Sequence, residues 1–473
     1  MNHLRWAARA ARPAALLVFA GALAACGGGS TMTGAACLPE PARQWLADAP
    51  AAQAAAAAGG PVDLYVDASG SMVGYLRGAT DDRRPFQDLL AQLRAATAAG
   101  PEANVQRSYR LFGRTIRDLP AARADTLVQP DTYLCPAGAE GCDNQESRLD
   151  LVMRRIAQAP ANSLSVVVTD LWLSTSELEA SGPVAVGAPV AEMLAQGRAL
   201  GVLGVAAPYA GRIYDLPSGA TIERQGDRPL YVLLIGPTER VVAFRENLAR
   251  AGLRGYGADA RWSLFTADPS TGASAGQVQA AGGAFQQRAF LPPAAGIRAP
   301  QFVLSTDRSL RERLDASATP SSLTYTASTD GIRPGAVWRG PQTGVTRVYR
   351  LNGDPCAPNA WVPLQDLTEG WSGDTFELAA AQAATRLPRG GTYLLVGELR
   401  RTGLEIPSPA NAWMRQWSFN ASTEGRVLEQ PPAVFPTLNL AETAQILEAA
   451  AEQAARRRPV TLAGFTAVVR SEG

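Results

Sequence analysis

The sequence predicts an α/β domain with a doubly wound, mostly parallel sheet, followed by a β-rich, sandwich-like domain and a C-terminal helix and strand. Two observations support this prediction. Between residues 61 and 255, near-continuous apolar strands alternate with segments of helical periodicity, which is typical of a mostly parallel sheet covered on both faces. Beyond Gly257 the helical segments largely disappear, and short strands punctuated by Gly and Pro follow.

The α/β domain is expected to span residues 61–255. Its strands are predicted at 62–69, 108–116, 163–173, 201–209 and 228–236. Its helices are predicted at 85–100, 147–158, 190–200 and 238–253, because apolar residues recur there on one helical face. Because consecutive strands alternate with helices, their carboxyl ends are expected to meet at one edge of the sheet.

The β-rich domain is expected over residues 256–437. Its strands are predicted at 261–267, 301–307, 322–329, 336–340, 346–352, 374–381, 391–401 and 414–421. In the last segment, 438–473, Asn439 and Glu442 have the spacing of a capping pair, which predicts a helix to about Arg456, and a final strand is predicted at 461–469.

The composition excludes several kinds of chemistry. The 473 residues include 44 basic and 43 acidic side chains, and this near-zero net charge argues against a nucleic-acid partner, whose phosphates attract a basic field. Every basic residue is Arg, so a lysine Schiff base and a phosphate-loop lysine are excluded. The single histidine, His3, lies in a segment expected to be removed, which excludes Ser-His-Asp catalysis and His-ligated zinc. We therefore expect a protein that is not an enzyme.

The N-terminus predicts an export signal over residues 1–25. Arg5, Arg9 and Arg12 precede an apolar run that is too short to span a bilayer comfortably. The run ends in LAAC at Cys26, which resembles the lipobox of bacterial lipoproteins, although an ordinary secretory signal with an incidental cysteine is the alternative. The resemblance implies that Cys26 carries lipid and anchors the chain in the cell envelope. Residue 27 is Gly rather than Asp, which favours the outer membrane over the inner membrane by the same resemblance.

Four further cysteines follow in the part expected to be exported: Cys37, Cys135, Cys142 and Cys356. An even number in an exported chain indicates two disulfides, for which three pairings exist. The short spacing of Cys135 and Cys142 favours a local bridge, which leaves Cys37 to pair with Cys356 by elimination. Free buried thiols are the alternative. The surrounding residues 26–60 are rich in Gly and Ala and are predicted to form a tether.

One motif carries the candidate chemistry. The first predicted strand ends in Asp67, Ser69 and Ser71 at D-x-S-x-S spacing, where open α/β sheets place their ligands. Asp170 ends a later buried strand, and Ser147 opens a later helix. Thr126 competes with Ser147 as the third hydroxyl, but it lies further upstream of Asp170 and lacks a following amphipathic helix.

The motif and the order of the elements resemble those of a von Willebrand factor type A (VWA) domain. The resemblance implies a metal-ion-dependent adhesion site in which Ser69, Ser71 and Ser147 coordinate Mg²⁺, or another divalent cation such as Mn²⁺ or Ca²⁺. Asp67 and Asp170 would act mainly through water. Two departures from the family pattern are Ser147 in place of Thr, and Leu171 where the family often has Gly.

The ligand types suit a binding site better than an enzyme. Mg²⁺ is a hard cation that takes about six oxygens near 2.0–2.1 Å. Neutral hydroxyls leave its charge under-compensated, so the open position accepts a carboxylate from a protein partner. The sequence therefore predicts a lipid-anchored envelope protein that binds a partner through metal, and the alternative is a structural envelope scaffold with a silent site. A nucleophilic role for Asp67 or Ser69 is disfavoured, because phosphotransferases of related fold need D-x-D and no Lys is present.

Overall fold

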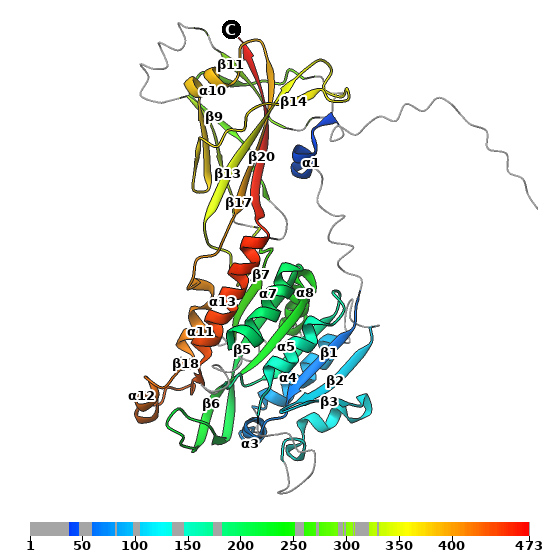
Figure 1. Ribbon diagram of the computed structural model, residues 1–473, viewed down its shortest axis with the longest axis vertical. Helices are drawn as coiled ribbons and strands as arrows, with labels where there is room; N and C mark the ends of the chain where they lie inside the picture. The colour runs from blue at the N-terminus through cyan, green and yellow to red at the C-terminus, as the bar shows by residue number, and fades with distance from the viewer. Residues whose placement is uncertain are drawn as a thin grey trace, which may run out of the picture.

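The computed structural model of the chain describes residues 37–46, 59–80, 83–97, 105–134, 146–173, 182–250, 260–270, 274–291, 297, 299–305, 307, 321–328 and 331–472. These residues form two lobes along one long axis (Figure 1). One lobe is an α/β domain, and the other is built from β-sheets. The prediction of an α/β domain joined to a β-rich domain is confirmed at this level.

The sheet of the α/β lobe has seven strands and is mixed rather than mostly parallel. In spatial order its strands are β3 (Ile116–Leu119), β2 (Arg107–Phe112), β1 (Val62–Asp67), β4 (Leu164–Thr169), β6 (Ile222–Pro237), β5 (Arg198–Ile213) and β7 (Arg261–Thr266). Only β1 with β2 and β1 with β4 pair in parallel, and the remaining pairs are antiparallel. The prediction of a mostly parallel sheet is therefore wrong for the edge strand β3 and for the half of the sheet beyond β4.

The error comes from a long hairpin. The predicted strands at 201–209 and 228–236 leave enough chain between them for a crossover, which parallel pairing requires. In the structure β5 and β6 are each 16 residues long, so the connection shrinks to residues 214–221 and only an antiparallel hairpin fits. Gly219, with φ 77°, lies in the turn, in a backbone conformation that glycine adopts without strain.

Helices cover both faces of the sheet, as predicted. The first face carries α3 (Val73–Arg77), α4 (Pro85–Thr97) and α8 (Thr238–Arg250). The second face carries α5 (Leu149–Ala157), α7 (Ala188–Ala195) and α13 (Leu440–Arg457). Along β1 the side chains alternate between the two cores, with Leu64 and Val66 in the first and Tyr65 in the second.

The C-terminal segment joins the two lobes instead of forming a unit of its own. Helix α13 packs against α7 on the α/β sheet, and β20 (Val460–Glu472) then enters the main sheet of the β-rich lobe (Figure 1).

Strand β7, predicted as the first strand of the β-rich domain, is instead the edge strand of the α/β sheet. The segment 414–421, predicted as a strand, contains the end of α11 (Ala412–Gln416) and the short β18 (Ser418–Phe419).

The β-rich lobe consists of two sheets around one core. The larger sheet contains β10 (Phe285–Gln287), β11 (Gln301–Ser305), β20, β17 (Thr392–Arg401), β13 (Gln342–Leu351) and β14 (Trp361–Pro363), with β8 (Ser274–Ala275) beside β20. The smaller sheet contains β15 (Trp371–Ser372), β16 (Thr375–Ala379), β12 (Ser322–Thr326) and β9 (Gln279–Ala281). Phe376 from the smaller sheet and Phe465 from the larger one meet between them, with ring centroids 5.0 Å apart.

The remaining described elements are short and lie in the connections. They are η2 (Gly70–Met72), η4 (Ala121–Val128), η5 (Pro130–Thr132), η6 (Gly182–Gly187), α10 (Ala380–Arg386), η9 (Pro409–Asn411), α12 (Glu424–Glu429) and β19 (Thr437–Leu438). Within the described ranges, every helix is too short or too polar to cross a membrane.

The end of the predicted tether is packed on the outer face of the larger β-sheet. Helix α1 (Glu40–Leu46) follows Cys37, which forms a disulfide with Cys356, the pair expected by elimination. Leu38 and Ala42 are buried against this sheet, and the Trp361 indole N–H donates to the Cys37 carbonyl at 2.9 Å. Cys26, the predicted site of lipidation, and the predicted Cys135–Cys142 bridge lie outside the described residues.

Candidate functional site

The predicted site residues meet where the direction of winding of the sheet reverses. From β1 the chain passes to β2 on one side, and it later returns to β4 on the other side of β1. The carboxyl ends of two adjacent parallel strands with diverging connections leave a crevice, which is where open α/β sheets bind ligands. Asp67 is the last residue of β1, and Asp170 directly follows β4.

Asp67 is the buried centre of this site. Its carboxylate is fully buried and accepts hydrogen bonds from the backbone N–H of Ser69 at 2.8 Å, from the Ser147 hydroxyl at 2.8 and 3.0 Å, and from the Thr169 hydroxyl at 2.7 Å. The register explains the last contact, because Val66 pairs with Val168 and the next residues along the parallel strands therefore lie side by side. A carboxylate with this many donors is held in one orientation.

Ser69 and Ser71 lie directly after β1, where η2 begins. Their hydroxyl oxygens are 3.0 Å apart. Helix α3 follows and packs closely against β5, because a Cβ atom on Gly74 would lie 2.1 Å from the Tyr209 ring. This close approach fixes the start of the helix and, with it, the loop that presents the two serines.

Ser147 approaches Asp67 from the loop before α5. The helix begins at Leu149, so Ser147 lies two residues before it and does not cap it. The loop is held by the Arg148 N–H, which donates to the Gly113 carbonyl at 3.0 Å. Thr126, the competing residue, lies on η4 and donates its hydroxyl to the Arg123 carbonyl at 2.8 Å. The structure therefore brings Ser147, and not Thr126, to the Asp67 carboxylate.

Asp170 is buried on the other side of the crevice. Its Oδ1 accepts from the Trp172 N–H at 3.2 Å, whereas its Oδ2 is buried without a hydrogen-bond partner in the described part of the chain. Leu171 between them has φ 48°, a left-handed conformation that stores of order 1–3 kcal/mol in a non-glycine residue. Its buried side chain, packed in the second core, holds the turn in place.

Sequence reasoning missed two residues of the site, Thr169 and Arg228. The sequence pattern places Thr169 within one predicted strand and Arg228 at the start of another, and it assigns neither residue to the site. Arg228 lies on β6, with Nη2 3.6 Å from Asp170 Oδ2, and both side chains are almost completely buried. An arginine at the start of an otherwise apolar strand was the available signal, because a buried guanidinium requires an acidic partner.

The electrostatics of the site depend on how close the two aspartates are in a buried environment. Desolvation, and secondarily the charge of Asp170, raise the pKa of Asp67 to about 7, against the opposing effect of its hydrogen bonds from Ser69 and Thr169. Burial of a carboxylate disfavours its charged form, and a neighbouring negative charge acts in the same direction. A cation bound between them would therefore be favoured by both carboxylates.

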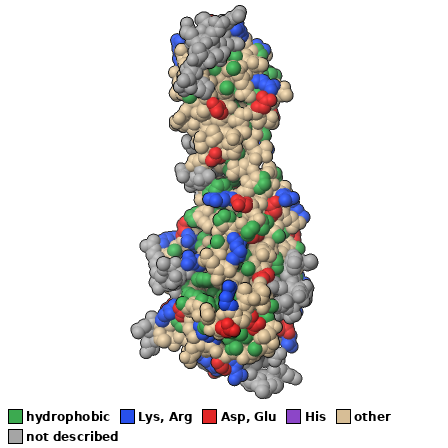
Figure 2. Space-filling model, turned by 90° about the vertical axis from the view of Figure 1, so that its left-hand side faces the viewer, with side chains coloured by type: hydrophobic (Ala, Val, Ile, Leu, Met, Phe, Trp, Pro, Cys, Tyr) green, Lys and Arg blue, Asp and Glu red, His purple; other side chains and the backbone are tan. Residues whose placement is uncertain are grey.

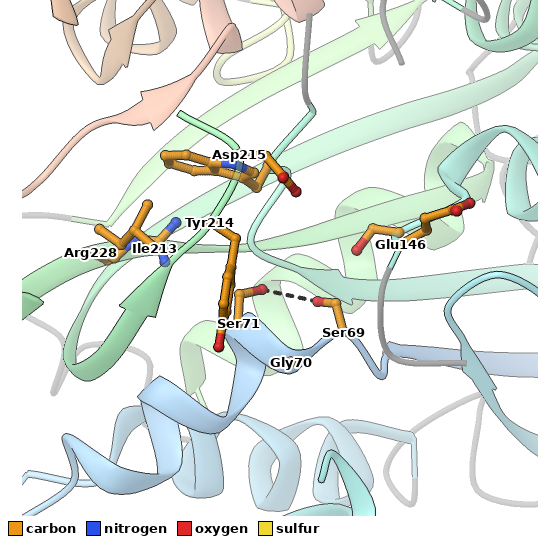
Figure 3. Close-up of a pocket in the computed structure, with 10 residues that line it drawn as sticks. Ser69, Gly70, Ser71, Glu146, Ile213, Tyr214, Asp215 and Arg228 are labelled. Atoms are coloured by element: carbon orange, nitrogen blue, oxygen red, sulfur yellow. Dashed lines mark hydrogen bonds between the residues drawn. The ribbon is translucent and has the colours of Figure 1, made fainter. Parts of the chain in front are cut away.

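A cavity of about 360 Å³ opens over these residues. It is lined by Ser69, Gly70, Ser71, Glu146, Ser147, Trp172, Ile213, Tyr214, Asp215 and Arg228. Figure 3 shows Arg228 and Ile213 on one side, Glu146 on the opposite side, and Ser69 and Ser71 between them. On the face shown in Figure 2, acidic and basic side chains are interspersed over the wider lobe, which agrees with the near-zero net charge.

The donor set fits a small hard cation. Cis ligands of an octahedral Mg²⁺ with bonds of about 2.0–2.1 Å are separated by about 2.9 Å, and the Ser69 and Ser71 hydroxyl oxygens are 3.0 Å apart. Asp170 also offers a buried oxygen without a hydrogen-bond partner. Among the described residues there is no cluster of three or more His, Cys, Asp or Glu side chains, so the donors here are mainly hydroxyls.

Comparisons of the chain with protein-family models, with curated proteins and with solved structures found no match. The site is therefore interpreted from its own geometry.

Proposed function

We propose that this chain is a lipid-anchored protein of the bacterial cell envelope whose VWA-like domain binds a protein partner through a divalent metal, Mg²⁺ or a cation such as Mn²⁺ or Ca²⁺. The proposal is carried by one observation: Asp67 is buried at the point where the sheet winding reverses, the Ser147 hydroxyl donates to its carboxylate, and the Ser69 and Ser71 hydroxyls lie 3.0 Å apart on the loop that follows it. The anchoring at Cys26 rests on the lipobox resemblance. An adhesion or assembly role follows from these two parts.

Each residue has a distinct task in this proposal. Ser69, Ser71 and Ser147 would hold the ion through neutral oxygens, and Asp67 and Asp170 would offset its charge through water. When bound, the metal would supply a positive charge that a carboxylate of the partner can coordinate. By linkage, the metal tightens the partner as much as the partner tightens the metal. The antiparallel β5–β6 hairpin is a departure from the expected sheet, but it lies beyond β4 and leaves the motif in place.

A second candidate function is a structural envelope scaffold with a silent metal site. Arg228 favours this alternative, because its guanidinium already provides a positive charge 3.6 Å from Asp170. A fixed internal cation reduces the attraction of the site for an external one. The two candidates differ in whether metal is needed for partner capture.

The experiment uses the mature chain and three variants. We expect wild-type protein to take up Mg²⁺ in calorimetric titration, to capture a partner from envelope extract in Mg²⁺, and to release it in EDTA. Asp67→Asn should abolish metal uptake and capture, and Ser147→Ala should weaken both about tenfold, the loss of about one ligand interaction. Thr126→Ala is the matched control, because its hydroxyl bonds elsewhere, and should change neither.

Two outcomes would overturn parts of the proposal. If Thr126→Ala abolishes binding and Ser147→Ala has no effect, the third ligand is wrongly assigned. If Asp67→Asn still captures its partner in EDTA, the metal is not used and the scaffold function is the correct one.

A further inference from the structure

Arg228 is the positively charged side chain among the described residues that line the cavity, and the proposed metal binding does not use it. Its side chain is 1% exposed and yet lines the cavity. The guanidinium carbon lies 4.5 Å from the ring centroid of Tyr209 and 4.9 Å from that of Trp172. Both rings lie within cation–π distance of the guanidinium, and the Tyr209 side chain also hydrogen-bonds to it, so the remaining N–H edges depend on other partners.

Two nitrogens of the Arg228 guanidinium lack a hydrogen-bond acceptor. Arg228 Nε and Nη1 are buried and have no hydrogen-bond partner among the described residues, and Nη2 faces Asp170. An arginine cannot lose its proton to relieve this, because its guanidinium stays protonated in proteins. A buried donor without an acceptor costs free energy, and more when it is charged. An acceptor that enters the cavity would recover that cost.

The charges of the site favour an anion as that acceptor. Two buried carboxylates, Asp67 and Asp170, stand against Arg228 and a divalent metal, so the loaded site carries one net positive charge. Glu146 and Asp215 add negative charge at the mouth, but Asp215 is exposed, and Glu146 is half-exposed and lies 3.4 Å from Arg114. Charges in contact with water are screened far more than the buried ones.

The cavity wall also indicates what carries the anion. Trp172, Ile213 and Tyr214 line it, and Tyr214 is 42% exposed, a large aromatic available for contact. A volume of about 360 Å³ exceeds what an isolated small anion fills. The carboxylate of an acidic side chain, with neighbouring peptide against the aromatic wall, matches both the charge and the shape.

The wall is built in advance of binding. Ile213 and Tyr214 belong to the end of the β5–β6 hairpin, whose turn is held by Glu424 of α12, which accepts from the Ser218 N–H at 3.0 Å and from its hydroxyl at 2.6 Å. Arg83 and Asp227 form a two-point ion pair at 2.9 and 3.0 Å further along the hairpin. A wall held at these points loses little further freedom when a ligand binds, which favours affinity.

We propose that Arg228 is the anion-binding residue of this cavity, and that its ligand is an acidic side chain of a polypeptide partner, bound between the metal and the Arg228 guanidinium. The inference rests on the proposed function, in which the partner supplies a carboxylate, and it adds the residue that recognises this carboxylate. In this inference Arg228 binds the carboxylate, and the serines hold the metal.

The test measures two affinities separately on the mature chain. The probes are Mg²⁺ alone, a capped aspartyl pentapeptide with leucines beside the aspartate, the same peptide with asparagine, and inorganic phosphate. In Mg²⁺ we expect the aspartyl peptide to bind at least about tenfold more tightly than the asparaginyl peptide, and Arg228→Gln to weaken it about tenfold or more, the effect of one charge-assisted hydrogen bond. The Mg²⁺ affinity of Arg228→Gln should be unchanged or higher, because a competing positive charge is removed.

The outcomes separate this inference from the proposed function. If Arg228→Gln binds the aspartyl peptide as tightly as wild type does, the assignment of Arg228 is wrong. If phosphate binds as tightly as the peptide, the cavity takes small anions and the polypeptide partner is wrong. If the peptide binds equally well in EDTA and Arg228→Gln still abolishes it, the metal function fails while the role of Arg228 stands. Should Arg228→Gln not fold, Arg228→Lys keeps a positive charge beside Asp170 without the planar fork, and the same losses are expected.

Discussion

Replacement of Thr169 by valine would test the hydrogen-bond network that orients Asp67. Thr169 is 2% exposed, and valine has nearly the same shape, so Thr169→Val removes hydrogen bonds without opening a cavity. The hydroxyl has two partners: it donates to Asp67 Oδ2 at 2.7 Å and accepts from the Leu171 N–H at 3.1 Å. Both are lost in the variant.

The magnitude follows from these two contacts. A hydrogen bond to a charged group contributes about 1.5–3 kcal/mol, and an N–H left buried without an acceptor costs about 1–3 kcal/mol. We expect Thr169→Val to lower the free energy of unfolding by about 2.5–6 kcal/mol above the pKa of Asp67, which burial and Asp170 raise to about 7. Below that pH the carboxyl is neutral, the first contribution falls to about 1 kcal/mol, and the loss should be smaller.

The assay is urea unfolding, followed by far-UV circular dichroism in EDTA at about pH 5 and about pH 8, on either side of that pKa. Thr126→Val is the control, because the Thr126 hydroxyl makes an exposed hydrogen bond within its own turn, and it should change the free energy by less than about 0.5 kcal/mol. Equal losses for the two variants, or a loss at position 169 that does not depend on pH, would refute the description of Asp67 as a buried carboxylate oriented by this hydroxyl.

Three further predictions concern pH, the disulfide and the anchor. Because the folded pKa of Asp67 lies above its ordinary value of 3.8, the unfolded chain releases this proton first, so the stability of the metal-free protein should fall as pH rises from about 4 to about 7. Asp67→Asn should flatten that part of a pH series of urea unfolding curves. Breaking the Cys37–Cys356 bridge, which spans 319 positions, with a Cys37→Ser and Cys356→Ser pair should lower the free energy of unfolding by up to about 6 kcal/mol in the chain-entropy description, and an unchanged urea midpoint would contradict this. Cys26→Ala should leave the protein unprocessed or release it to the soluble fraction, and a processed variant that stays membrane-bound would show that Cys26 is not the anchor.

The motif could be located from the sequence because local signals defined it. Asp67 and Asp170 each end a short run of apolar, β-branched residues, and two such strands in parallel place their ends together. Ser147 could be preferred over Thr126 because it precedes an amphipathic helix. These inferences need only strand ends and helix starts, which residue patterns define well.

The half of the sheet beyond β4 could not be predicted, because a buried strand carries no signal of direction. The run 198–213 is apolar throughout most of its length, and such a run suits parallel and antiparallel neighbours alike. The two strands of the hairpin extend into segments that contain polar residues, 210–213 and 222–227. These segments do not match an apolar strand pattern, so the sequence did not show that the turn between the strands is short. Thr169 was missed because its partner, Asp67, lies on another strand, at a separation that no local pattern encodes. Arg228 gives a local signal, as an arginine at the start of an apolar strand, but the sequence pattern does not identify Asp170 as its partner.

The disulfide at Cys37 also determines how the molecule would carry tension. Without it, a pull on the N-terminal segment would pass along the chain into β1 and would draw on the strand that ends in Asp67. With it, the force leaves the backbone at Cys37, crosses to Cys356 and spreads into the larger sheet of the β-rich lobe, through β13 and its neighbours. A pull that arrives from the N-terminal segment would then be resisted by the β-rich lobe and α13, and it would not enter β1 at Val62. The bridge thus separates the N-terminal end of β1 from a load on the N-terminal segment.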